Sequence, residues 1–148
     1  MKWLLDTNVV SEPIRSRPHA KVVGWLTAIA REDAVVSVVT LAELRDGAAT
    51  AVEEQRRTIL AAWLDNQIAP SFHDRTLPVT DDILIDWIGL SRRLRRAGKP
   101  RDPADLLLAA TARAHHLIVA TRNIQDFADT GIVVYDPLTD ETHRMDRP

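Results

Sequence analysis

Residues 102–120 read DPADLLLAATARAHHLIVA, and this stretch decides the fold class. Asp102 followed by Pro103 is typical of a helix start, because aspartate caps free backbone N–H groups and proline suits the first helical position. The helix expected over residues 104–116 is apolar nearly all round, which indicates burial at the centre of the protein. Residues 117–120 are apolar and partly β-branched, so they predict a strand directly after it.

The same alternation of helices and short strands continues toward both ends of the chain. Short apolar or β-branched runs predict further strands, and apolar side chains at helical spacing predict further helices. Strands separated by helices imply an α/β protein with a mostly parallel sheet covered on both faces. The further strands are expected at residues 3–5, 34–39 and 132–135, and the further helices at 22–29, 41–50, 53–64 and from Thr80 to Leu94.

Three segments give weaker patterns. We expect a loop over residues 69–76, and a short strand at best over residues 77–79, where Pro78 removes a backbone donor. The polar tail after Pro137, residues 137–148, is expected to fray. Residues 1–136 are therefore expected to form one domain.

Composition excludes several classes of protein. The 148 residues include 45% hydrophobic and 27% charged residues, an ordinary mix for one globular domain. No apolar run is long enough to span a membrane, and Asp6 comes too early for a secretory signal, so a cytoplasmic location is expected. The absence of cysteine excludes disulfides and thiolate zinc sites. A net charge of −2 excludes a uniformly basic surface for binding nucleic acid.

Four acids are expected to converge at one edge of the sheet. Asp6 ends the first strand, Glu43 lies early in the helix after the second strand, Asp105 lies in the first turn of the buried helix, and Asp126 follows the strand at 117–120. In open parallel sheets, ligands bind at the carboxyl ends of the strands. Carboxylates repel each other, so they cluster readily only around a cation. A site made only of oxygen ligands suits Mg²⁺ or Mn²⁺. Such ions activate water for attack on phosphates.

Each acid also has a purely structural interpretation, which is favoured when that acid is taken alone. Asp6 would be a turn residue, Glu43 would pair with Arg45 or Arg57, and Asp105 and Asp126 would stabilise helix starts. Asp102 is interpreted as a cap. Thr7, Asn8 and Thr121 would either orient ligands or cap helices.

Four motifs, in order along the chain, resemble those of PIN domains, in the form used by the FitB-like branch of VapC toxins. The resemblance extends from Lys2 to about Tyr135. The motifs are Leu4-Leu5-Asp6-Thr7-Asn8-Val9-Val10-Ser11-Glu12, Thr40-Leu41-Ala42-Glu43-Leu44-Arg45, Asp105-Leu106-Leu107-Leu108-Ala109-Ala110-Thr111-Ala112 and Thr121-Arg122-Asn123-Ile124-Gln125-Asp126-Phe127.

The resemblance implies a three-layer α/β/α fold and an endoribonuclease that depends on Mg²⁺ or Mn²⁺. It implies the toxin role in a type II toxin–antitoxin pair, with a small DNA-binding antitoxin as partner, promoter DNA contacted through that antitoxin, and a homodimer. By motif, Asp6, Glu43, Asp105 and Asp126 become the catalytic metal ligands. Many relatives carry an acid where this chain has Asn123, so the fourth contact is left open between Asn123 and Asp126.

Two other functions compete with this interpretation. A phosphoryl-acceptor receiver domain would need an acidic pair at the first strand, an acceptor aspartate on the third strand and a late lysine, and this set is missing. A module that docks an antitoxin and helps repress a promoter, with little nuclease activity, stays open. The basic run from Arg92 to Arg101 is either a solvated helix end or an RNA-backbone contact.

Overall fold

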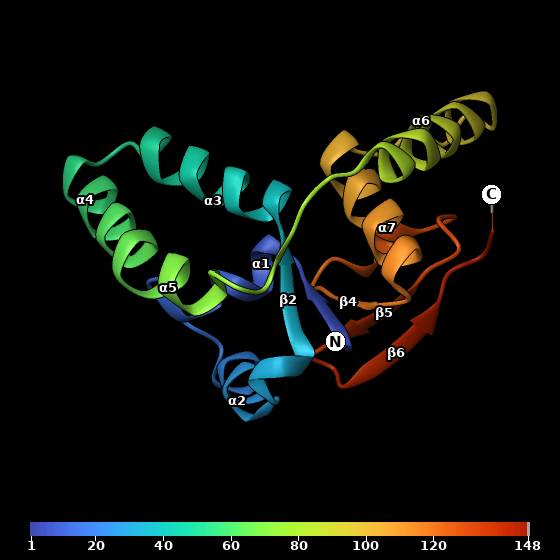
Figure 1. Ribbon diagram of the computed structural model, residues 1–148. Helices are drawn as coiled ribbons and strands as arrows, with labels where there is room; N and C mark the ends of the chain where they lie inside the picture. Colours follow the sequence, from blue (N-terminus) through green and yellow to red (C-terminus); the bar gives the residue numbers. More distant parts are fainter. Residues whose placement is uncertain (148) are drawn as a thin grey trace.

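The computed structural model describes residues 1–147, in which six strands form one sheet in the order β3-β2-β1-β4-β5-β6 (Figure 1). The strands are β1 (Trp3–Leu5), β2 (Ala34–Ser37), β3 (Thr76–Leu77), β4 (Ile118–Ala120), β5 (Val133–Asp136) and β6 (Glu141–Arg144). The helices are α1 (Thr7–Val10), α2 (Ala20–Ala28), α3 (Val38–Thr50), α4 (Glu54–Trp63), α5 (Ala69–Phe72), α6 (Asp81–Arg96) and α7 (Pro103–His115). Short 3₁₀ turns lie at η1 (Glu12–Ile14), η2 (Arg31–Asp33) and η4 (Ile124–Phe127), and a π-helical turn, η3 (Leu64–Ile68), joins α4 to α5.

The sheet is parallel except at one edge. β1 pairs with β2 and β4, β2 with β3, and β4 with β5, all in parallel, whereas β6 is antiparallel to β5. The chain runs outward from β1 to β3 on one side and then returns to the other side of β1 to form β4 and β5. This reversal between β1 and β4 makes their carboxyl ends the expected position of a site.

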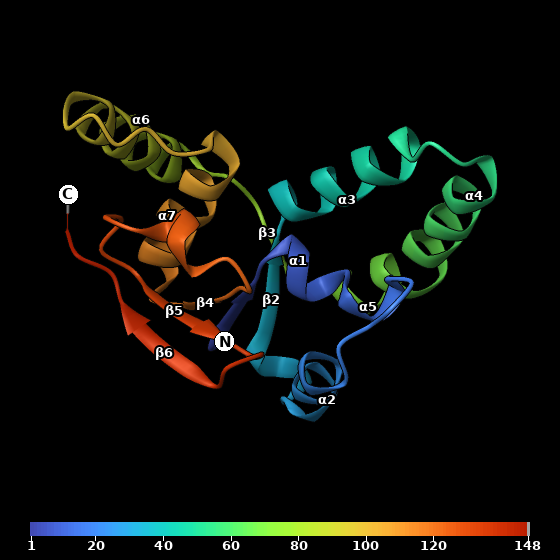
Figure 2. The same cartoon turned by 180° about the vertical axis from the view of Figure 1, so that it is seen from behind.

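Two apolar cores lie on opposite faces of the sheet, because side chains alternate along each strand. Leu4, Val35 and Val119 pack with residues of α6 and α7. The neighbouring Leu5 and Val36 pack with residues of α1, α3 and α4. Figures 1 and 2 show α6 and α7 on one side of the strands and α3, α4 and α5 on the other. The predicted three-layer α/β/α architecture with a mostly parallel sheet is therefore confirmed.

Within residues 137–147 the polar tail does not fray as expected, and residue 148 lies outside the described residues. Residues 141–144 form β6, whose backbone pairs with β5. Met145 packs against the core, and the Tyr135 hydroxyl donates a 2.7 Å hydrogen bond to Asp140. The prediction was wrong because an edge strand exposed to solvent needs no apolar pattern when backbone hydrogen bonds hold it in place.

Two other boundaries differ from the sequence-based expectation. The expected loop at residues 69–76 is helical as far as Phe72, because α5 continues directly from η3 and buries Ile68 and Phe72. The expected strand at 34–39 ends at Ser37, because the Ser37 hydroxyl accepts a 3.1 Å bond from the N–H of Val39 and starts α3 early. No helix within residues 1–147 is long and apolar enough to cross a membrane.

Candidate active site

The four predicted acids lie around the carboxyl ends of β1 and β4. Asp6 follows β1 directly, and Asp126 lies in η4, shortly after β4. Glu43 lies in α3, which begins directly at the end of β2, and Asp105 lies in the first turn of α7. The charges of Glu43 and Asp126 act on Asp6, and the charges of the other three act on Asp105. Asp6 and Asp105 are therefore each within electrostatic range of other predicted acids, and the roles of the four stay a prediction.

Asp6 is buried and held by three donors. The N–H of Thr7 donates to Oδ1 at 2.7 Å, while the Thr121 hydroxyl and the Asn8 amide donate to Oδ2 at 2.8 and 3.3 Å. Burial raises the pKa of Asp6 to about 6, with smaller increases from the charges of Glu43 and Asp126, and the bonds from Thr121 and Thr7 offset part of this. Asp6 also caps α1, so its structural interpretation applies, and its role as a metal ligand stays a prediction.

Asp105 is half-buried and differs from Asp102 in its surroundings. The carboxylate of Asp102 accepts bonds from the N–H groups of Ala104 and Asp105 at 2.9 and 3.4 Å, so Asp102 is the cap, as predicted. Burial raises the pKa of Asp105 to about 7, and the charges of Asp6, Asp126, Asp102 and Glu43 add to the increase. A carboxyl with this pKa carries an unfavourable charge at neutral pH unless a cation compensates for it.

Glu43 and Asp126 are the other two predicted acids. Glu43 is exposed and accepts a 2.9 Å bond from the Thr7 hydroxyl. The expected pairing of Glu43 with a nearby arginine does not form, since Arg45 pairs with Asp65 and Arg57 donates to the carbonyls of residues 51 and 52. Asp126 is half-buried.

The fourth contact stays a prediction, open between Asp126 and Asn123. Asn123 is exposed, and its side chain forms no cap bond. The charge of Asp126 acts on both Asp6 and Asp105, so Asp126 belongs to the acidic group electrostatically.

The donors of this group suit a hard divalent cation. All four are carboxylates, and two of them have raised pKa values that a cation would lower. Within residues 1–147, no three His, Asp or Glu side chains stand close enough to hold an ion as they are placed. Mg²⁺ keeps several waters and is usually bound through one or two carboxylates, so it does not require three carboxylates in direct contact with the ion.

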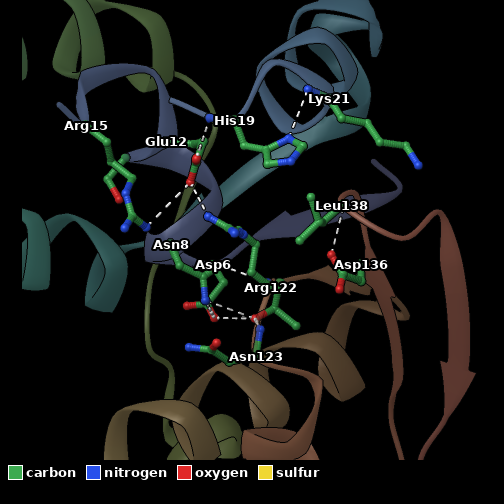
Figure 3. Close-up of polar contacts among 12 residues, drawn as sticks. Asp6, Asn8, Glu12, Arg15, His19, Lys21, Arg122, Asn123, Asp136 and Leu138 are labelled. Atoms are coloured by element: carbon green, nitrogen blue, oxygen red, sulfur yellow. Dashed lines mark hydrogen bonds and ion pairs between the residues drawn. The ribbon is translucent and has the colours of Figure 1, made fainter. Parts of the chain in front are cut away.

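A buried ion pair supports the site and was not predicted from the sequence. Glu12, at 1% exposure, accepts a 2.8 Å bond from Arg122 Nη1 and another from the N–H of His19 (Figure 3). Burial raises the pKa of Glu12, but the bonds from His19 and Arg122 and the charges of Arg122 and Arg15 outweigh burial and lower it.

The same arginine is joined to the acidic group through Asn8. The N–H of Arg122 donates to the Asn8 side-chain oxygen at 3.1 Å, and the Asn8 amide reaches Asp6 and Thr121. The pair therefore fastens the segment after β4 to the segment after β1 (Figure 3). The only signal for this pair in the sequence is the position of Glu12 next to an apolar segment. An acid that is buried with such a segment requires a partner for its charge.

Comparison with known proteins identifies the family. The model of the PIN domain matches residues 3–133. The chain belongs to the PIN-domain family. It is 37% identical to Toxin FitB of Neisseria gonorrhoeae over 137 residues, which cover 93% of this chain and 99% of the relative. It is 36% identical to VapC ribonuclease Y4jK of Sinorhizobium fredii over 134 residues, which cover 90% and 96%.

A solved structure gives the same result for this PIN domain. The structure of FitAB bound to the IR36 DNA fragment matches with a TM-score of 0.85 and 34% identity, covering 96% of this chain and 99% of that chain. The resemblance to the FitB-like branch of VapC toxins, read from four motifs, is thereby confirmed.

Proposed function

We propose that this PIN domain is an endoribonuclease that depends on Mg²⁺ or Mn²⁺ and acts as the toxin of a toxin–antitoxin pair. One observation carries the proposal. Four carboxylates come from four separate segments around the reversal point of a parallel sheet, and burial together with the charges of the other acids raises the pKa values of Asp6 and Asp105. Structural caps would not need this arrangement, because like charges held together cost stability.

Asp6, Glu43, Asp105 and Asp126 would hold the ion, directly or through its waters. When bound, a divalent cation lowers the pKa of a bound water and neutralises charge on a phosphate under attack. Thr121 and Asn8 hold the Asp6 carboxylate in one orientation, and the hydroxyl of Thr7 does the same for Glu43. These bonds restrict the side chains before substrate arrives, so less ordering is required on binding.

RNA is the proposed substrate and a small DNA-binding antitoxin the proposed partner. The relatives include a protein named as a VapC ribonuclease, and the FitB relative is a toxin whose complex with FitA has been solved on DNA. An apolar cavity of about 400 Å³, with Leu26, Trp63 and Phe72 in its lining, lies between α2 and the α4–α5 segment. Its dimensions and apolar character suit one face of a partner helix.

The test is cleavage of RNA by the purified chain, with Mn²⁺ and with EDTA. We expect cleavage that EDTA abolishes and that Asp105→Asn reduces by at least two orders of magnitude, as expected for removal of a group that stabilises the transition state. Asp46→Asn is the matched control, because Asp46 is an exposed aspartate on α3 outside the acidic group. Equal cleavage by Asp105→Asn and the parent, or cleavage that survives EDTA, would contradict the proposal.

The second candidate function, an antitoxin-docking module with little nuclease activity, is favoured by the same apolar cavity. The two functions separate on one comparison. If Asp105→Asn abolishes the arrest of growth caused by expression of the chain, toxicity depends on the acidic group. If growth is unaffected by the parent chain while the chain still enhances DNA binding by its partner, the docking function is correct.

A further inference from the structure

The basic run of residues 92–101 does not form one surface. Arg92, Arg95 and Arg101 line a hollow of about 400 Å³ between α6 and the chain that leads into α7. Arg93 lines a different cavity, near the starts of β4 and β5, and Arg96 lines neither of the two. The run is divided because the side chains of successive helix residues point about 100° apart. Neighbours in sequence therefore lie on different faces of the helix.

The walls of this hollow, which we call the α6–α7 pocket, are apolar and include an indole ring. Trp87, Ile88, Pro100, Pro103 and Leu106 contribute to the lining. The Trp87 indole N–H donates a 3.0 Å hydrogen bond to the carbonyl of Pro103, which fixes the ring between α6 and the start of α7. A fixed, partly exposed aromatic wall is the surface on which a nucleobase stacks.

The arginines give the pocket a charge that the described carboxylates only partly neutralise. Arg101 pairs with Asp129 at 3.4 Å. Arg92 and Arg95 are exposed, and within residues 1–147 neither forms an ion pair. A pocket with apolar walls and two free guanidinium groups at its rim matches a nucleotide, which combines a flat base with a charged phosphate.

The α6–α7 pocket and the acidic group share the first turn of α7. Pro103 and Leu106 of its lining and Asp105 of the acidic group belong to the same first turn of α7. Side chains on different faces of one helical turn are separated by at most about 10–12 Å, the diameter of a helix, so a nucleotide in the pocket and a phosphate at Asp105 can belong to one strand of a few nucleotides. We propose that the α6–α7 pocket binds one nucleotide of single-stranded RNA, with the base against Trp87 and flanking phosphates at Arg92 and Arg95. This inference rests on the proposed function, since it assigns a subsite to that same substrate.

The test measures binding of a fluorescein-labelled single-stranded RNA of about 12 nucleotides, in EDTA, as a function of salt. Arg95→Gln and Arg92→Gln should each reduce the slope of log affinity against log salt by about 0.7, the value for one phosphate contact on a single strand. Arg96→Gln removes the same charge from the same helix and should leave the slope unchanged. Equal slopes for Arg95→Gln and Arg96→Gln would overturn the phosphate assignment.

The stacking part is tested with Trp87→Leu, which keeps an apolar side chain, and with Trp87→Phe, which keeps a ring. Trp87→Leu should weaken binding by roughly 5- to 150-fold, and Trp87→Phe should recover most of the loss. A series of RNAs, each lacking the base at one position, locates the stacked base. The parent should bind one of these RNAs more weakly than the intact RNA, and Trp87→Leu should bind that RNA as well as it binds the intact one. Circular dichroism melts verify that each variant is folded.

Two results would overturn the proposal. One is unchanged RNA affinity in Trp87→Leu. The other is unchanged RNA affinity with an altered mass in solution, which would make the pocket a protein interface. A parallel cleavage assay with Mn²⁺ keeps the two proposals apart. Absence of cleavage by the parent refutes the nuclease, whereas the EDTA binding data test the pocket independently.

Discussion

Asp6→Asn should make the protein more stable when no metal is present, and this result would separate a metal site from a set of helix caps. Asparagine keeps the shape of aspartate and remains a good cap for α1. It removes a buried charge that is placed near Glu43 and Asp126. A carboxyl whose pKa is raised on folding adds stability at low pH, and this stability is lost as the pH rises through the folded-state pKa.

The magnitude follows from the pKa of Asp6. Its increase from 3.8 to about 6, at about 1.36 kcal/mol per pH unit, makes the ionised carboxylate unfavourable by about 3 kcal/mol. The new amide N–H₂ would face the Thr121 hydroxyl and the Asn8 amide, which costs about 1 kcal/mol. The variant should therefore gain about 2 kcal/mol near pH 8, which raises Tm by about 4 to 8 °C for a chain of this size. Near pH 5 the gain should fall below about 1 kcal/mol.

The assay is a thermal melt of the parent, Asp6→Asn and the exposed control Asp46→Asn, in EDTA and then in Mn²⁺. Mn²⁺ should stabilise the parent and the control and should stabilise Asp6→Asn much less, since an ion that binds only the folded state shifts the folding equilibrium. A variant that melts below the parent near pH 8 in EDTA, with its response to Mn²⁺ intact, would refute the reasoning and leave Asp6 as a cap.

Three further outcomes are expected. Cleavage products should carry 5′-phosphate and 3′-hydroxyl ends, since attack by water needs no 2′-hydroxyl, and end-group analysis that finds 2′,3′-cyclic phosphates would exclude this chemistry. Arg122→Met should lower the free energy of unfolding by about 2 kcal/mol, because the buried carboxylate of Glu12 loses its 2.8 Å partner and keeps only the N–H of His19 and the more distant Arg15. In urea titrations this loss should shrink below about pH 4.5, since the lowered pKa of Glu12 means that its stabilising contribution is lost as the pH falls. Removal of residues 138–148 should lower Tm and promote aggregation, measured by light scattering, because β5 loses its partner strand and Met145 leaves the core.

Much of the fold could be predicted from local pattern. The buried helix α7 and its cap Asp102 were predicted from a short stretch, because a helix that is apolar all round has only one possible environment. β6 was missed, since its residues are polar and only pairing with β5 makes them a strand. The helical turn ending at Phe72 was missed because its proline and polar residues favour a loop when burial is unknown.

The acids of the candidate site could be predicted because strand ends and helix starts are local features, and a parallel sheet brings them to one edge. Tertiary structure alone decided three other features. These are the bonds that hold Asp6, the pairing of Glu12 with Arg122 across 110 positions, and the division of the arginines between two cavities. The physical reason is that a sequence pattern specifies the face on which a side chain lies. The partner it meets there depends on how separate segments pack, and that is fixed only when the whole core forms.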